Sequence, residues 1–145
     1  MICYLDSSAI VKLYVDEEAS DTVRELVDSA VVVGTSSIAY AEVRAAFARG
    51  LREGALDEAG YRRAVASFHA DWPTFLSLEA VDSLLFLAGD LTEKYRLRGF
   101  DAIHLAAAIV LQRKVKEPIT FACWDSRLWE AALTHGLSVL PKHRP

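Results

Sequence analysis

Four acidic residues stand at positions from which they could do chemistry together: Asp6, Glu42, Asp101 and Asp125. Asp6 and Asp125 follow short apolar runs typical of buried strands, whereas Glu42 and Asp101 fall in segments with a helical pattern. A ligand set made only of carboxylates suits the hard cations Mg²⁺ and Mn²⁺ and not zinc. We therefore predict that these four residues are metal ligands.

A metal ion would also explain how the acids can lie together. Carboxylates at the ends of neighbouring strands, about 4.8 Å apart, can reach one cation at oxygen distances of about 2.1 Å. Without it they repel one another, and at least one takes up a proton. A bound divalent ion lowers the pKa of its water and polarises phosphoryl oxygens. The predicted chemistry is hydrolysis of a phosphodiester, with the same four residues as catalytic residues.

Each acid also has an ordinary explanation. The three aspartates precede helical segments, where aspartate serves as an N-cap or as a partner of the helix dipole. Glu42 caps nothing, and its alternative is an exposed helical glutamate paired with Arg44 or Arg49. Only the combination of two acids after strands with two acids near helix starts favours a shared site.

The elements that must position these acids follow from the hydrophobic pattern. We expect strands at 2–5, 31–33, 75–78, 119–123 and 137–140, and helices at 9–15, 17–29, 38–51, 57–72, 81–97, 101–111 and 126–134. Strands that alternate with helices predict an α/β fold, a three-layer α/β/α sandwich with a mainly parallel sheet. In such sheets ligands bind beyond the carboxyl ends of the strands, near the point where the strand order reverses.

Length and composition predict one globular domain over residues 1–145, because 52% of the residues are hydrophobic. No apolar run approaches the roughly 20 residues of a membrane span, and the start lacks the pattern of a signal peptide. We therefore expect a cytoplasmic protein that is not bound to membranes. Cys3 and Cys123 lie in apolar runs, which indicates buried thiols and not a zinc site.

The net charge of −4 argues at first against a nucleic-acid partner, which usually leaves a basic footprint. If four of the 20 acidic side chains bind metal, however, the remaining ones equal the 16 lysines and arginines in number. Bound cations would then make the site attractive to phosphate. The charge of the whole chain decides nothing here.

Four segments of the sequence together resemble the PIN-domain nucleases. They are Tyr4-Leu5-Asp6-Ser7-Ser8-Ala9-Ile10-Val11-Lys12-Leu13-Tyr14, Thr35-Ser36-Ser37 with Ala41-Glu42-Val43, Phe100-Asp101-Ala102-Ile103-His104-Leu105-Ala106, and Trp124-Asp125-Ser126-Arg127-Leu128. The match spans essentially the whole chain. The order of the acids and the chain length resemble in particular the VapC-type toxins of bacterial and archaeal toxin–antitoxin pairs.

The resemblance implies a homodimeric ribonuclease that depends on Mg²⁺ or Mn²⁺ and is silenced by a cognate antitoxin laid across its active site. It carries the four acids over as metal ligands and Ser7 as a nearby hydroxyl. The sequence departs from the pattern at Ser126, which follows the fourth acid where a second carboxylate would stand. A second metal position would therefore be weakly held.

Four residues are candidates for contact with the substrate. Ser7 follows the first acid, and Arg44 and Arg98 lie close in sequence to acids and are hypothetical phosphate contacts. His104 lies three residues after Asp101, on the same helical face, where it either touches substrate or is simply packed or exposed. Which RNA is cut does not follow from the sequence, because RNA specificity depends on loop shape and unstacked bases.

Other classes of protein remain open. A phosphatase of haloacid-dehalogenase type would use Asp6 as nucleophile, but it needs a second Asp where Ser8 stands. A receiver domain lacks its paired acids, and neither class has a role for Glu42. A PIN-like binding protein without turnover is the non-enzyme alternative. Apolar residues on the middle helices either form a dimer interface or pack in the core: Phe47, Leu51, Tyr61, Phe68, Trp72 and Phe86.

Overall fold

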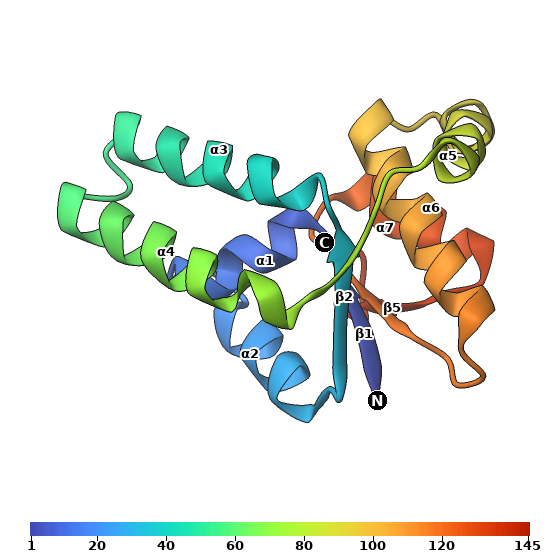
Figure 1. Cartoon of the computed structure of the whole chain (residues 1–145), viewed down its shortest axis with the longest axis horizontal. Coiled ribbons are helices and arrows are strands. Elements are labelled where there is room, and N and C mark those ends of the chain that lie inside the picture. The colour runs from blue at the N-terminus through green and yellow to red at the C-terminus, as the bar shows by residue number, and fades with distance from the viewer.

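A five-stranded parallel sheet forms the centre of the fold in the computed structural model, which describes all residues 1–145 (Figure 1). The strand order is β3-β2-β1-β4-β5, and every neighbouring pair is parallel. The strands are β1 (Ile2–Leu5), β2 (Val32–Ser36), β3 (Leu76–Leu78), β4 (Thr120–Ala122) and β5 (Ser138–Leu140). The predicted α/β sandwich with a parallel sheet is confirmed.

Seven α-helices and one short 3-10 helix connect the strands. They are α1 (Ser7–Tyr14), α2 (Ser20–Ser29), α3 (Ala39–Arg52), α4 (Glu58–Asp71), η1 (Trp72–Thr74), α5 (Asp82–Tyr95), α6 (Gly99–Lys114) and α7 (Ser126–His135). The main differences from prediction are at helix starts: α6 begins two residues before Asp101, and α2 begins at Ser20 instead of Glu17. None of these helices combines the length and the apolar character that a membrane crossing requires.

The two faces of the sheet bury alternate side chains of the same strand. In β1, Ile2 and Tyr4 pack with α5, α6 and α7, whereas Cys3 and Leu5 pack with α1 to α4. This alternation is the normal consequence of a pleated strand covered on both sides. Cys3 and Cys123 are free thiols and fully buried, which confirms the predicted burial.

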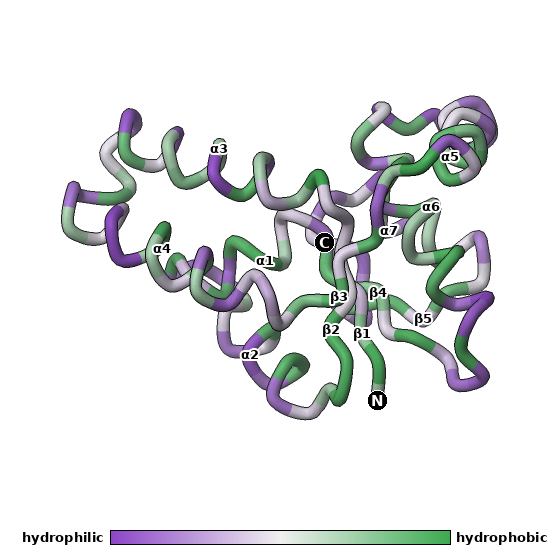
Figure 2. The backbone as a smooth tube through the Cα atoms, in the orientation of Figure 1, coloured by the Kyte–Doolittle hydropathy of each residue, from purple (hydrophilic) through white to green (hydrophobic).

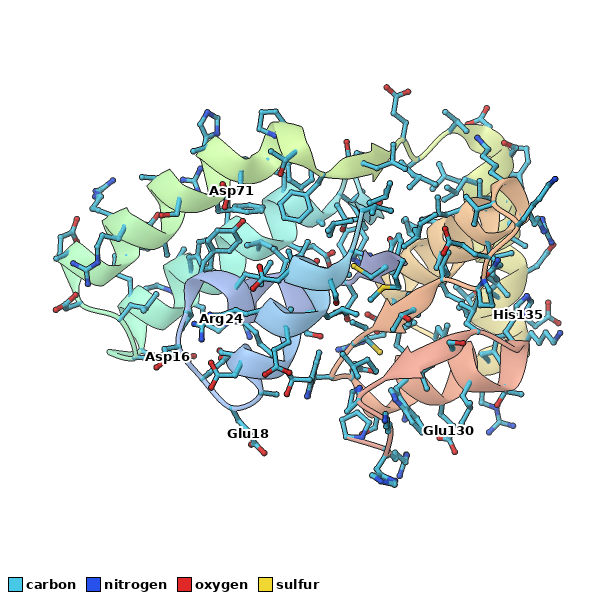
Figure 3. All side chains as sticks on the ribbon, turned by 90° about the horizontal axis from the view of Figure 1, so that it is seen from below. Asp16, Glu18, Arg24, Asp71, Glu130 and His135 are labelled. Carbon is cyan, nitrogen blue, oxygen red and sulfur yellow. The ribbon has the colours of Figure 1, made fainter.

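The helices have one buried, mainly apolar face, as expected of helices that cover a sheet. In Figure 2 the central strands are hydrophobic, while hydrophobic and hydrophilic residues alternate along α3 and α4. Figure 3 shows Glu18 and Glu130 projecting outward from the ribbon. Of the six apolar residues considered for a dimer interface, Phe47 and Phe68 are fully buried and belong to the core, whereas Phe86 is 71% exposed.

The strand order reverses between β1 and β4, and this reversal locates the site. The chain passes from β1 to β2 and β3 on one side, and later returns through α6 to β4 and β5 on the other. Connections on opposite sides leave a crevice at the carboxyl ends of β1 and β4. Asp6 directly follows β1, and Asp125 lies three residues after β4.

Candidate active site

All four predicted acids line one pocket of about 350 Å³ at this crevice. They come from separate elements: Asp6 from the start of α1, Glu42 from α3, Asp101 from the first turn of α6 and Asp125 from the start of α7. The other residues lining the pocket are Ser7, Ser8, Val11, Ala46, Arg49, Arg98 and His104. The fold therefore brings together residues from distant parts of the sequence; Asp6 and Asp125 are 119 positions apart.

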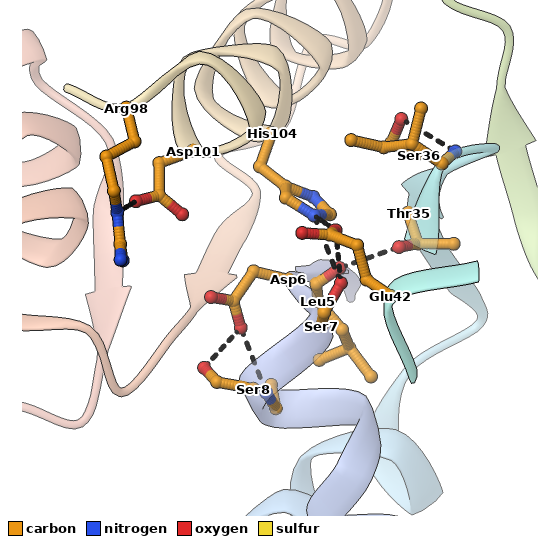
Figure 4. Close-up of polar contacts among 12 residues, drawn as sticks. Leu5, Asp6, Ser7, Ser8, Thr35, Ser36, Glu42, Arg98, Asp101 and His104 are labelled. Atoms are coloured by element: carbon orange, nitrogen blue, oxygen red, sulfur yellow. Dashed lines mark hydrogen bonds and ion pairs between the residues drawn. The ribbon is translucent and has the colours of Figure 1, made fainter. Parts of the chain in front are cut away.

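Asp6 is the most buried of the four acids, with 4% of its surface exposed. It caps α1: its Oδ1 accepts hydrogen bonds from the Ala9 amide at 2.9 Å and the Ser8 hydroxyl at 2.7 Å (Figure 4). Burial raises the pKa of Asp6 to about 6, and these hydrogen bonds oppose the shift only in part. Ser8 also accepts a hydrogen bond from the Trp124 amide at 3.0 Å, which links α1 to the segment after β4.

Glu42 is held by two side chains from other elements (Figure 4). Its Oε1 lies 2.6 Å from the Ser7 hydroxyl and 2.7 Å from Nε2 of His104. Burial alone would raise the pKa of Glu42, but the hydrogen bonds and charge of His104 and the Ser7 bond outweigh it, so that the pKa is lowered. Glu42 is therefore ionised at neutral pH, although it is partly buried in the first turn of α3.

His104 connects Glu42 to the core. Its side chain is 2% exposed, and its Nδ1 lies 2.8 Å from the hydroxyl of the fully buried Tyr4. An ionised carboxylate can only accept, so Nε2 carries the hydrogen that is donated to Glu42; in the neutral ring, Nδ1 then accepts from Tyr4. Of the alternatives open for His104 from the sequence, substrate contact or a packed or exposed side chain, the structure shows the packed one, which has almost no surface to offer a substrate. His104 instead positions Glu42.

Tyr4→Phe tests this chain of hydrogen bonds. We expect the variant to lose about 1–3 kcal/mol of unfolding free energy, because Nδ1 of His104 is left buried without a partner. Urea unfolding in the presence of chelator measures the loss. Tyr95→Phe is the matched control, because the Tyr95 hydroxyl lies 3.0 Å from Nδ1 of His135 in a part-buried pair outside the site. Equal losses in the two variants would show that the buried network has no special role.

Asp101 and Asp125 share one arginine. Arg98 Nε lies 3.1 Å from Asp101 Oδ2, and Arg98 Nη2 lies 3.2 Å from Asp125 Oδ2. Burial, followed by repulsion from Asp125, raises the pKa of Asp101, and Arg98 opposes this shift. Asp125 also caps α7 by accepting from the Leu128 amide at 2.9 Å. The positive guanidinium thus partly neutralises two acids that would otherwise repel each other.

Of the two arginines predicted to contact phosphate, only one lies at the pocket. Arg98 lines the pocket, but Arg44 does not: its Nη1 donates to the Tyr40 hydroxyl at 3.2 Å. Two residues along a helix turn by about 200°, so Arg44 points away from Glu42. Arg49 lies seven residues after Glu42, returns to the same face and lines the pocket. Sequence reasoning missed Arg49 as a site residue, although its helical spacing was the available signal.

The donor chemistry of the pocket fits a hard divalent cation, because four carboxylates face one small volume. As the side chains stand, however, no three acidic, cysteine or histidine groups are arranged to coordinate a single metal ion. The contacts explain this arrangement: Glu42 is engaged by Ser7 and His104, and Arg98 bridges Asp101 and Asp125. A cation that took both Asp101 Oδ2 and Asp125 Oδ2 as ligands would have to displace Arg98.

Comparison with known proteins identifies the class to which this fold and site belong. The sequence model of the PIN domain matches residues 3–115. The chain therefore belongs to the PIN domain family, and the family resemblance inferred from its four segments is confirmed.

Individual relatives match nearly end to end. The chain is 35% identical to Ribonuclease VapC45 of Mycobacterium tuberculosis (strain CDC 1551 / Oshkosh), over 97% of this chain and 95% of that protein. It is 39% identical to Ribonuclease VapC46 of Mycobacterium tuberculosis (strain ATCC 25618 / H37Rv), over 94% and 95% respectively. A toxin–antitoxin complex from Klebsiella pneumoniae contains a similar fold, with a TM-score of 0.67, 14% identity and 99% of both chains covered.

Proposed function

We propose that this PIN-domain protein is an endoribonuclease that depends on Mg²⁺ or Mn²⁺ and acts as the VapC-type toxin of a toxin–antitoxin pair. The observation that carries the proposal is the convergence of Asp6, Glu42, Asp101 and Asp125 on one pocket at the strand-order reversal. Relatives at 35% and 39% identity that are named ribonucleases support the choice of RNA as substrate.

Asp6, Glu42, Asp101 and Asp125 are the proposed ligands of the cation. When bound, the divalent ion activates water and stabilises charge on the phosphodiester. The chain's own residues prepare this site: Ser7 and His104 hold Glu42 ionised and oriented, and the caps of α1 and α7 fix Asp6 and Asp125. Arg98 and Arg49 are the basic groups that line the pocket, and they suit the phosphates of an RNA chain.

Arg98 occupies the space between two proposed ligands and should therefore compete with the cation. We expect Arg98→Ala to bind Mn²⁺ roughly two- to tenfold more tightly, because the cation no longer has to break two ion pairs of the strength usual at a protein surface. The variant should also bind RNA more weakly, with a smaller salt dependence. Calorimetric Mn²⁺ titration and RNA binding at several salt concentrations measure both effects.

Arg24→Ala provides the control for Arg98, because Arg24 also bridges two aspartates, Asp16 at 3.5 Å and Asp21 at 2.9 Å, away from the pocket. Its Mn²⁺ and RNA affinities should stay at the wild-type values. Unchanged Mn²⁺ affinity in Arg98→Ala would contradict the competition.

We further propose that the partners are a cognate antitoxin and a second copy of the chain. The similarity to a fold found in a toxin–antitoxin complex supports the first. The second follows from the family resemblance. Of the six apolar residues considered for an interface, only Phe86 has most of its surface exposed and therefore available to a second copy. Light scattering of wild type and Phe86→Glu would test the dimer.

The phosphatase and the silent binding protein are weaker candidates. Asp6 Oδ1 is already engaged in capping α1, and a phosphatase leaves the ionised, positioned Glu42 without a role. The test is incubation of RNA with the purified protein and Mn²⁺, with and without EDTA. Cleavage that EDTA abolishes supports the nuclease. Release of phosphate from a small phosphoester without RNA cleavage supports the phosphatase. The absence of both activities supports the binding protein.

A further inference from the structure

Phe100 exposes an aromatic ring at the edge of the active site. It is the second residue of α6 and stands between Arg98 and Asp101 in sequence, and 60% of its surface is exposed. The other exposed large apolar residues are Met1, Val31, Leu76, Val81, Leu85, Phe86 and Leu133. Among these eight, Phe100 is the only one that lines a pocket together with Glu42 and Asp101.

The surroundings of Phe100 are charged and open. The pocket of about 390 Å³ that it lines is completed by Glu42, Arg98, Gly99 and Asp101, so that Phe100 is its only hydrophobic residue. A Cβ added at Gly99 would meet no atom within 4 Å, so the space next to this residue is open. With 60% of its surface exposed, the Phe100 ring is not held in place by core packing.

A lone aromatic face among charges suits a nucleotide better than a protein surface. A protein partner usually buries a cluster of apolar side chains, such as Leu85 and Phe86 on α5 provide together with Val81 just before that helix. A nucleotide instead offers one flat base and one phosphate, which match one ring and the neighbouring guanidinium of Arg98. Bases can stack on aromatic rings only when they are unpaired or splayed out of a helix.

On the basis of the ribonuclease function proposed above, we propose that Phe100 is a stacking platform for an unpaired nucleobase beside the scissile phosphodiester. The substrate class is then RNA that is single-stranded at the cleavage point: a loop, a bulge or an unstructured stretch. Stacking tolerates any base, so Phe100 selects for strandedness and not for sequence.

The experiment compares Phe100→Ala, Phe100→Trp and the control Val31→Ala, which trims another exposed apolar side chain, one that does not line the pocket. A single-stranded oligonucleotide with 2-aminopurine beside the cleavage point reports stacking through quenching of its fluorescence. We expect Phe100→Ala to lose the quenching and to bind about 10- to 100-fold more weakly, with the same loss in kcat/KM. Phe100→Trp should restore both, Val31→Ala should change neither, and Mn²⁺ affinity should be the same in all variants.

Three results would overturn the stacking platform. They are unchanged binding and quenching in Phe100→Ala, failure of Phe100→Trp to restore them, and a defect of Phe100→Ala confined to association with a protein partner or a second copy. Failure of the nuclease function is distinguishable: wild type would then cleave no RNA under any metal condition, whereas the binding and quenching assay would still decide the role of Phe100.

Discussion

Asp101→Asn is expected to lower the rate of RNA cleavage by at least about 10³-fold, since a lost carboxylate ligand costs several kcal/mol of charge stabilisation and each 1.4 kcal/mol is about tenfold in rate. Asparagine keeps the shape of Asp101 but not its charge, and in the wild type this carboxylate faces Arg98 in the pocket. Single-turnover cleavage of a labelled RNA with saturating Mn²⁺ measures the loss directly.

Asp90→Asn is the control for this loss, because Asp90 is an exposed acid of α5 that lines neither pocket containing Glu42. Its cleavage rate should equal that of the wild type. If Asp101→Asn kept more than about a tenth of the wild-type rate, the carboxylate would not be a ligand of the catalytic ion.

Asp6→Asn is expected to stabilise the metal-free protein while abolishing cleavage. The pKa of Asp6 is raised from an ordinary value of 3.8 to about 6, so the folded chain binds its proton more tightly than the unfolded chain does. Stability is therefore lost as the pH rises from about 4 to about 6, and the full cost, on the order of 3 kcal/mol, is present above pH 6. Asparagine removes that cost and can still cap α1 through its oxygen.

Urea unfolding with EDTA at pH 4 and at pH 7.5 measures the effect. We expect Asp6→Asn to be more stable than the wild type by up to about 3 kcal/mol at the higher pH and nearly equal to it at the lower. Asp57→Asn is the matched control: Asp57 caps α4 through the Gly60 amide at 2.7 Å but is exposed. A gain for Asp6→Asn that is the same at both pH values would show that ionisation of Asp6 is not its cause.

The sequence predicts those parts of the site that depend on local pattern. Strand–helix alternation places Asp6 and Asp125 at the carboxyl edge of a parallel sheet, and the structure places them there, at the reversal between β1 and β4. Strand order itself does not follow from local pattern, because it depends on which helices pack on which face. Helical spacing distinguishes Arg49 from Arg44, since a separation of seven residues returns to the face of Glu42 and a separation of two does not.

Contacts between distant segments are beyond such reasoning. The link from Tyr4 through His104 to Glu42 joins β1, α6 and α3 and appears only when these elements pack together. A histidine after an acid in a helix is compatible with substrate contact or with burial, and only the structure shows that the side chain is buried. The exposure of Phe100 is equally invisible in the sequence, because phenylalanine in an apolar helix normally indicates core packing.

Titration of the metal-free protein with Mn²⁺, followed by calorimetry or by loss of the free-ion paramagnetic resonance signal, tests most directly whether these acids form a cation site. We expect the wild type to bind at least one Mn²⁺, and Asp6→Asn, Glu42→Gln, Asp101→Asn and Asp125→Asn each to bind it more than about tenfold more weakly, while Asp90→Asn binds it normally. Mn²⁺ binding that is equally strong in the wild type and in all four amide variants would contradict the proposed site.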